Sequence, residues 1–112
     1  MGTKYTFKCN KCGYSVESSG GNDYGYWATV ETHICNSCNN LVDILVGEYG
    51  KTYSKDYVLK NIANLREGSD FYACTQCGSK DQLELWDTQK RPCPKCDGLM
   101  EINNDGQILL WD

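Results

Sequence analysis

All eight cysteines of the chain occur in Cys-x-x-Cys pairs, which are Cys9/Cys12, Cys35/Cys38, Cys74/Cys77 and Cys93/Cys96. Two thiolates three residues apart lie on one tight turn and can bind the same tetrahedral metal ion, so two such turns complete a four-sulfur site. The residue after each pair is of a type that readily adopts the backbone conformation of a turn around a metal, which is often left-handed. These residues are Gly13, Asn39, Gly78 and Asp97, which precedes Gly98. The pattern therefore predicts that two zinc ions bind per chain.

We expect the pairs to combine in sequence order, Cys9/Cys12 with Cys35/Cys38 and Cys74/Cys77 with Cys93/Cys96. The intervening loops of 22 and 15 residues cost less chain entropy to close than the longer loops of the other schemes. The difference is only about 1 kcal/mol. The prediction therefore depends equally on the strand pattern that each half of the chain carries.

Length and charge limit the architecture and the partners. At 112 residues the chain can form one ordinary domain or two small ones, and units this small need a metal or a disulfide to stabilise their cores. The chain has 11 basic and 15 acidic residues and a formal charge of -4, to which each four-thiolate zinc site would add about -2. Such a chain is a poor binder of phosphate backbones, so nucleic-acid binding is a less favoured alternative to a protein partner.

Disulfides are the other common use of eight cysteines in a small chain, above all in secreted proteins. The first residues form no apolar signal segment, no run of about 18 apolar residues occurs, and no Asn-x-Ser/Thr acceptor is present. We therefore expect a reducing, cytoplasmic location and thiolates that bind metal.

Alternation of apolar and polar residues predicts short antiparallel strands around the cysteine pairs. The expected strands lie at residues 5–8, 14–17, 26–34, 41–46, 83–86, 99–102 and 108–111. The run Asn103-Asn-Asp-Gly106 predicts a hairpin between the last two strands. The tryptophans Trp86 and Trp111, which end two of these segments, are interpreted as core or strand-pairing residues.

The segment without cysteines, residues 49–70, is expected to connect two ribbons. Its apolar residues recur at helical spacing, which predicts a short helix at about 55–67 that begins after Ser54 and ends before Gly68. This helix is expected to cover an apolar face of one ribbon. The fold class is therefore small, metal-stapled and mainly β, with one ribbon in residues 1–48 and another in residues 71–112.

The cysteine turns resemble those of the zinc-ribbon superfamily, on the strength of Cys-x-x-Cys-Gly at residues 9–13 and 74–78 and Cys-Pro-x-Cys at residues 93–96. The resemblance covers residues 5–46 and 71–112. The plan is also similar to that of small uncharacterised bacterial proteins with tandem zinc ribbons and a terminal Trp-Asp. Zinc ribbons bind nucleic acids, dock subunits or support enzymes, so the resemblance implies a fold and a metal rather than one activity.

The first pair also resembles rubredoxin, in which Cys-x-x-Cys-Gly-Tyr is combined with Cys-Pro-x-Cys-Gly around one iron ion. Cys9 to Tyr14 match the first of these patterns. The pair expected to complete that site, Cys35 to Asn39, lacks the proline and the glycine, while the pair at Cys93 and Cys96 has the proline. A rubredoxin-like iron electron carrier is therefore a further alternative to a zinc protein.

Thirteen aromatic residues in so small a chain favour a structural or adaptor protein that acts through protein-protein contacts. Short hairpins cannot bury all of them, and exposed aromatic side chains form interfaces. The turn-rich residues 18–25 are expected to form a loop, and loops on a rigid scaffold often carry recognition residues. The candidate partner-binding residues are Tyr24, Tyr26 and Trp27, with Tyr24 as the exposed anchor. The alternative is that these rings pack across the strands of the first ribbon.

Catalysis is not expected. A catalytic zinc usually has three protein ligands and a water molecule, whereas the cysteine count allows four thiolates at each site. The single histidine, His33, lies two residues before Cys35 and is expected to be a strand residue or a neighbour of the site rather than a ligand.

Overall fold

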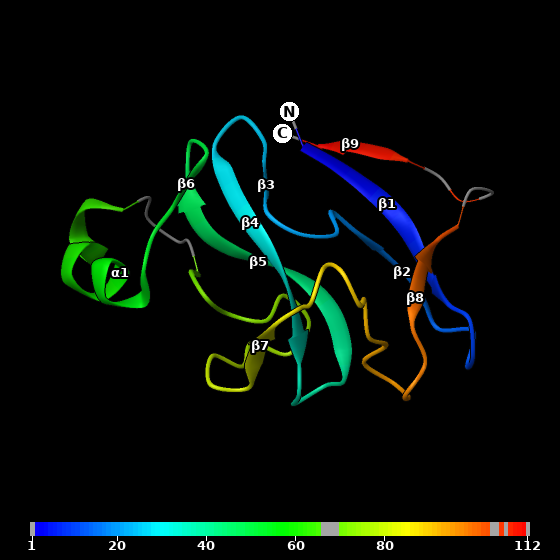
Figure 1. Ribbon diagram of the computed structural model, residues 1–112. Coiled ribbons are helices and arrows are strands. Elements are labelled where there is room, and N and C mark those ends of the chain that lie inside the picture. Colours follow the sequence, from blue (N-terminus) through cyan, green and yellow to red (C-terminus); the bar gives the residue numbers. More distant parts are fainter. Residues whose placement is uncertain (1, 66–69, 104–105, 107, 112) are drawn as a thin grey trace.

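The computed structural model describes residues 2–65, 70–103, 106 and 108–111, and consists mainly of strands (Figure 1). The strands are β1 (Gly2–Cys9), β2 (Ser15–Ser18), β3 (Asp23–Tyr24), β4 (Ala28–Cys35), β5 (Asn40–Glu48), β6 (Lys51–Thr52), β7 (Leu83–Leu85), β8 (Met100–Ile102) and β9 (Leu109–Trp111). One short helix, α1 (Lys55–Asn61), continues into a 3-10 turn (Ile62–Asn64). These elements confirm a small, mainly β protein with antiparallel sheets. None of the helices in the described residues has the length and apolar character needed to span a membrane.

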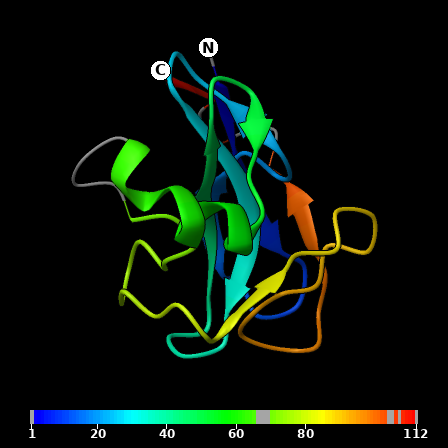
Figure 2. The same cartoon turned by 90° about the vertical axis from the view of Figure 1, so that its left-hand side faces the viewer.

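The strands form two antiparallel sheets that each combine early and late parts of the chain. In the four-stranded sheet, β1 pairs with β2 on one side and with both β8 and β9 on the other. In the five-stranded sheet the order is β3-β4-β5-β6, and β7 pairs with β4 beyond the end of β3. Figures 1 and 2 show the late strands lying beside the early ones. The pairing that we expected within the first half is present, since β1 pairs with β2 and β4 pairs with β5. The strands of the second half differ from the expectation, because β7, β8 and β9 pair with strands of the first half.

The last two strands do not form the expected hairpin. Both run antiparallel to β1 along the same edge, with Met100 opposite Cys9 and Trp111 opposite Gly2. Directly after β8 the chain still lies beside β1, because the Asn103 amide donates to the Thr6 carbonyl oxygen at 2.8 Å. Strands β8 and β9 therefore run in the same direction, and the types of the turn-forming residues between them do not by themselves predict whether the chain reverses.

Part of the predicted loop at residues 18–25 is strand β3, and the rest is fixed by one buried carboxylate. Asp43 on β5 accepts hydrogen bonds from the Ser18 hydroxyl at 2.8 Å, the Thr32 hydroxyl at 2.7 Å and the Ser19 amide at 2.9 Å. Ser18 ends β2, whereas Thr32 lies on β4. These bonds therefore connect the two sheets and hold the loop that leads to Tyr24.

Two apolar cores lie on opposite faces of β5. The first contains Phe7, Leu41, Trp86 and Met100, and the second contains Val42, Ile44 and Val46. The Trp86 ring packs edge-to-face on Phe7 with centroids 5.4 Å apart, and its Nε1 donates to the Pro92 carbonyl oxygen at 2.8 Å. This contact confirms that Trp86 is a core residue, and Trp111 is the strand-pairing residue opposite Gly2.

Helix α1 begins as expected, because the Ser54 hydroxyl accepts a hydrogen bond from the Tyr57 amide at 3.1 Å. It is shorter than the predicted helix, since it ends at Asn61 and the 3-10 turn ends at Asn64. Residues 66–68, including the predicted stop at Gly68, lie outside the described residues. Val58 is the buried residue of α1, and the Tyr57 ring of the same helix packs on Tyr53 with centroids 4.6 Å apart. Figure 2 shows the helix in front of the five-stranded sheet.

Candidate metal centres

The eight cysteines form two four-sulfur groups, each with its sulfur atoms within 4.8 Å of one another. The first group consists of Cys9, Cys12, Cys93 and Cys96, and the second of Cys35, Cys38, Cys74 and Cys77. The sequence-order combination that we predicted is therefore wrong. The longer loops cost about 1 to 2 kcal/mol more to close, an amount that the pairing of β8 with β1 and of β7 with β4 can readily offset.

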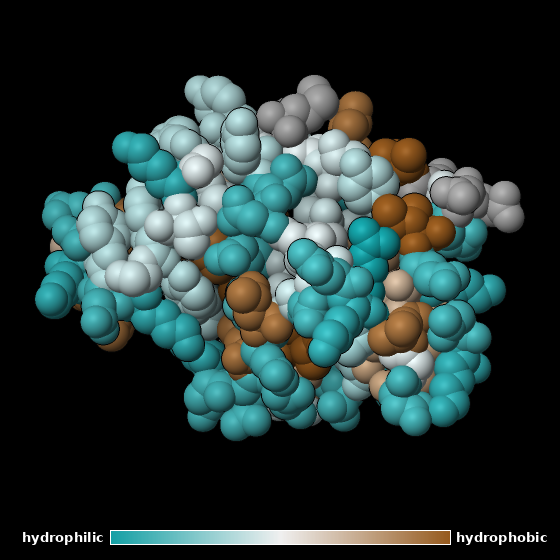
Figure 3. All heavy atoms as spheres, in the orientation of Figure 1, coloured by the Kyte–Doolittle hydropathy of each residue, from teal (hydrophilic) through white to brown (hydrophobic). Residues whose placement is uncertain are grey.

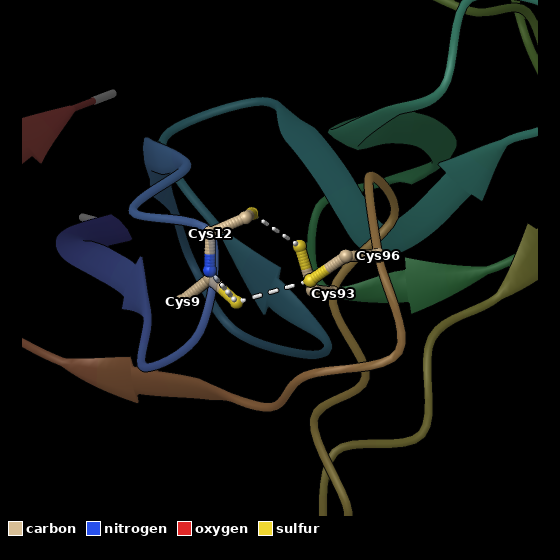
Figure 4. A group of neighbouring side chains, drawn as sticks. All are labelled: Cys9, Cys12, Cys93 and Cys96. Carbon is tan, nitrogen blue, oxygen red and sulfur yellow. Dashed lines mark hydrogen bonds between the residues drawn. The ribbon is translucent and has the colours of Figure 1, made fainter.

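The distances between sulfur atoms fit a bound metal ion rather than disulfides. In the first group (Figure 4) the Sγ atoms of Cys9 and Cys96 are 3.5 Å apart. In the second group the Sγ atoms of Cys38 and Cys74 are 3.7 Å apart. A disulfide requires about 2.05 Å, whereas sulfur atoms 2.3 Å from a tetrahedral zinc ion lie about 3.8 Å from one another. All eight thiols are free of disulfides.

Backbone amides at each turn point toward the sulfur atoms and make them better metal ligands. Amide nitrogens of Lys11 and Cys12 lie 3.3 and 3.4 Å from the Cys9 sulfur. The corresponding amide of Gln76 lies 3.4 Å from the Cys74 sulfur. Such bonds favour the thiolate over the thiol, because the amide dipole stabilises negative charge on sulfur.

Three of the four turns close as the sequence predicted. Gly13, Asn39 and Gly78 have positive φ angles of 81°, 54° and 80°. The fourth turn differs, since neither Asp97 nor Gly98 has a positive φ. Gly98 is needed for space, because a Cβ atom there would lie 2.8 Å from the Cys9 sulfur and 2.7 Å from the Lys11 Cβ. The turn at Cys93 and Cys96 can approach the first turn only with glycine at this position.

Hydrogen bonding and burial separate the pKa values of the thiols before metal binds. The amide of Cys12 is the main cause that lowers the pKa of Cys9 to about 6, and the amide of Ser79 is the main cause that lowers the pKa of Cys77 to about 7. Burial raises the pKa of Cys35 and of Cys93 to about 12. Each group therefore has one thiol whose pKa lies well below the ordinary value and at least one thiol whose proton the metal must displace.

The neighbouring side chains connect the first group to the second. The Tyr14 hydroxyl accepts a hydrogen bond from the Leu41 amide at 3.2 Å and lies 3.4 Å from Asn40 Oδ1. Asn40 directly follows the turn of Cys35 and Cys38. The Lys95 ammonium lies 5.5 Å from the centre of the Tyr14 ring, and Lys11 forms an ion pair with Asp97 across the two turns of the first group. The Lys11–Asp97 pair thus joins the two turns of the first group, and Lys95 joins the second of these turns to Tyr14.

His33 lies on β4, opposite Val42, as a strand residue. Its Nδ1 is 3.0 Å from the backbone oxygen of Glu31, and the ring is buried. In the described residues the two candidate metal groups contain cysteines only.

The predicted partner-binding residues lie at an end of the five-stranded sheet, away from the cysteines. Tyr24 and Tyr26 are 54% and 81% exposed, whereas Trp27 is half-buried and its Nε1 donates to Glu48 Oε2 at 2.7 Å. Sequence reasoning did not select Tyr49, which is 67% exposed. The sequence Tyr49-Gly50 after an apolar strand could have indicated an exposed turn residue. These two residues form a tight turn with φ angles of 52° and 79°.

Comparison with known proteins adds no relative. No protein-family model matches the chain, and no curated protein or solved structure is significantly similar to it. The two four-cysteine groups in a small, mainly β chain are consistent with zinc-ribbon-like turns.

Pairs of cysteine substitutions distinguish the two ways of combining the turns. Cys12→Ser with Cys96→Ser damages only the first group, so this variant should keep one tightly bound metal ion per chain. Cys12→Ser with Cys38→Ser damages both groups, so this variant should keep none with full affinity. Metal analysis after dialysis against a weak chelator measures both variants. The combination in sequence order requires the reverse result.

The pKa values predict pH-dependent metal binding. Cys35 and Cys93 keep their protons well above neutral pH, so metal must displace at least one proton at each group. Lowering the pH from 9 to 7 raises the competition from protons and should weaken zinc binding by about tenfold or more per pH unit at each group. Competition with a chromophoric chelator measures the affinity at each pH. A zinc affinity that stays constant between pH 9 and pH 7 would contradict the raised pKa values of Cys35 and Cys93.

Proposed function

We propose that the protein is a zinc-binding structural or adaptor protein that acts through contacts with another protein. The observation that carries the proposal is the saturation of both metal groups by four sulfur atoms drawn from distant segments. A tetrahedral ion held by four thiolates has no open position for water or substrate, which is typical of structural rather than catalytic zinc. The metal then stabilises the fold, and residues on the protein surface bind the partner protein.

Zinc is the metal that this arrangement favours. Four thiolates in a tetrahedron suit zinc, and binding of a structural zinc ion contributes about 10 to 16 kcal/mol to folding. The two apolar cores are small and each includes cysteines of one group. Folding of this chain is therefore expected to depend on the metal.

Metal analysis tests this proposal. Protein produced with both zinc and iron available should contain two zinc ions per chain. Removal of the metal with a strong chelator under reducing conditions should abolish the near-ultraviolet circular dichroism signal of the packed aromatic residues, which include Trp86, and zinc addition should restore it. A chain that keeps this signal without metal would contradict a structural role for zinc.

A rubredoxin-like iron site is the second candidate, and the observed combination of turns favours it at the first group. This group joins Cys9-x-x-Cys12-Gly13-Tyr14 to Cys93-Pro94-x-Cys96, the two patterns that rubredoxin combines. The glycine of the second pattern comes one residue later, at Gly98. If this candidate is right, metal analysis finds one iron ion per chain, the protein is red, and Cys12→Ser removes the colour whereas Cys77→Ser does not.

The exposed tyrosines are the surface that we assign to the partner. Tyr24 ends β3, Tyr26 follows it, and Tyr49 follows the end of β5. The Tyr49 amide donates to the Trp27 carbonyl oxygen at 2.7 Å, and a Cβ atom at Gly50 would lie 3.7 Å from the Tyr24 ring, so the two segments are adjacent. The Asp43 hydrogen bonds hold the loop before Tyr24 in place. Tyr49 occupies a left-handed conformation that costs a tyrosine about 1 kcal/mol relative to asparagine or glycine. An exposed aromatic residue at a costly position is consistent with selection for contact rather than for stability.

Substitutions at this surface should separate stability from partner binding. Tyr49→Asn relieves the backbone cost, so it should raise the melting temperature by about 4 °C or more. Tyr26→Ala removes an exposed ring and should leave the melting temperature nearly unchanged. Both variants should retain less of the partner than the unmodified protein in quantitative co-purification from the native host. Lys51→Ala, on the neighbouring strand β6, is the matched control. Unchanged capture by both tyrosine variants would contradict this surface.

A further inference from the structure

Exposed aliphatic side chains cluster in the last two strands and at the residue directly before each of them. The group consists of Leu99, Ile102, Ile108, Leu109 and Leu110. Ile108 and Leu110 are the most exposed, at 64% and 65%. Hydrophobic residues are visible along the β8 and β9 side of the molecule in Figure 3. Exposed apolar residues clustered on one element mark an interaction surface more often than isolated ones do.

The outer edge of β9 is open. On its inner side β9 pairs with β1, and no described strand pairs with its outer side. The neighbouring strand β8 differs, because the chain covers its beginning: the Met100 amide donates to the Arg91 carbonyl oxygen at 2.6 Å, and Pro92 forms a bridge with Leu99. Alternate residues of a strand direct their amide and carbonyl groups to opposite sides. The β9 backbone therefore has hydrogen-bonding groups that face outward.

This edge lacks the protection found on the other edge strands. Proteins prevent unwanted pairing at sheet edges with charged residues, prolines or bulges. Each of the other short edge strands carries a charge, at Glu17 in β2, Asp23 in β3, Lys51 in β6, Glu84 in β7 and Glu101 in β8. Strand β9 has the sequence Leu-Leu-Trp, with no charge. Among the described edge strands, only β9 is free of charged residues and apolar throughout.

We infer that two copies of this chain form a symmetric dimer by antiparallel pairing of β9 with β9 of the second copy. Two identical strands related by a two-fold axis pair in antiparallel orientation, so the same edge of each copy can form the hydrogen bonds of the interface. The chain has a net charge of -4, and β9 itself contributes none of it, so two acidic copies bring fewer like charges together at this strand than at the charged edge strands.

Pairing would join the two four-stranded sheets into one continuous sheet across the dimer. Side chains alternate along a strand, so Leu110 lies on one face of the sheet and Leu109 and Trp111 lie on the other. On the first face Leu110 would meet its counterpart and Ile108 of the second copy. This inference goes beyond the proposed function and holds whichever metal occupies the groups.

Sedimentation of the full-length, metal-loaded protein tests the dimer. Over concentrations from about 1 μM to about 1 mM, the mass should rise from 12.6 kDa toward twice that value. Leu110→Lys places a charge at the pairing edge and should weaken association by about 10- to 100-fold. Leu59→Lys alters a leucine that is 75% exposed on α1 and should leave association unchanged. Metal content and circular dichroism confirm that both variants are folded.

Amide hydrogen exchange gives an independent measurement on the unmodified protein. Exchange in residues 108–111 should slow as concentration rises, whereas exchange in α1 should not change. A chain that stays monomeric over the whole range overturns the inference. A dimer that Leu110→Lys leaves intact, or that does not protect residues 108–111, also overturns it, because its interface then lies elsewhere. Each of these results can occur with both metal groups intact, so failure of the dimer is distinct from failure of the proposed function.

Discussion

The fold depends on closing each four-sulfur group from two distant parts of the chain. The turn at Cys9 and Cys12 follows the first strand, and its partner turn at Cys93 and Cys96 precedes β8. A metal ion in this group would fix the end of β1 beside the start of β8, in agreement with the register that places Met100 opposite Cys9. A structural zinc ion typically contributes about 10 to 16 kcal/mol, which far exceeds the entropy of closing such loops. The strand pairing itself interleaves the early and late parts of the described chain.

Strand β5 connects the surroundings of the two cysteine groups, because an apolar core covers each of its faces. Leu41 points into the core beside the first group, whereas Val42 and Ile44 point into the core beside the second. Asp43, on the same face as Leu41, holds the end of β2. Loss of either metal should thus disturb packing on both sides of a single strand. This arrangement explains why residues 41–46 are mostly apolar rather than alternating.

The sequence predicted what neighbouring residues determine and missed what distant residues determine. Short-range signals correctly predicted the metal-binding pairs, the left-handed positions Gly13 and Gly78, and the cap at Ser54. The combination of the pairs was wrong, because loop entropy differs by only about 1 to 2 kcal/mol between schemes and strand pairing decides among them. The hairpin at residues 103–106 was wrong for the same reason, since turn residues carry no information about the strand beside which the chain returns.

Long-range pairing also changes the chemistry that the sequence implies. Taken in order along the chain, the turn at Cys9 and Cys12 combines with one that has no proline, which argues against a rubredoxin-like centre. In the structure it combines with the proline-containing turn at Cys93 and Cys96, and Gly98 gives that turn room to approach the Cys9 sulfur. The second group combines two turns without proline. The two groups therefore differ in the rigidity and hydrogen bonding of their turns, although their four ligands are the same. Selectivity for a metal is set by such surroundings as well as by the ligands, so each group needs its own metal assignment.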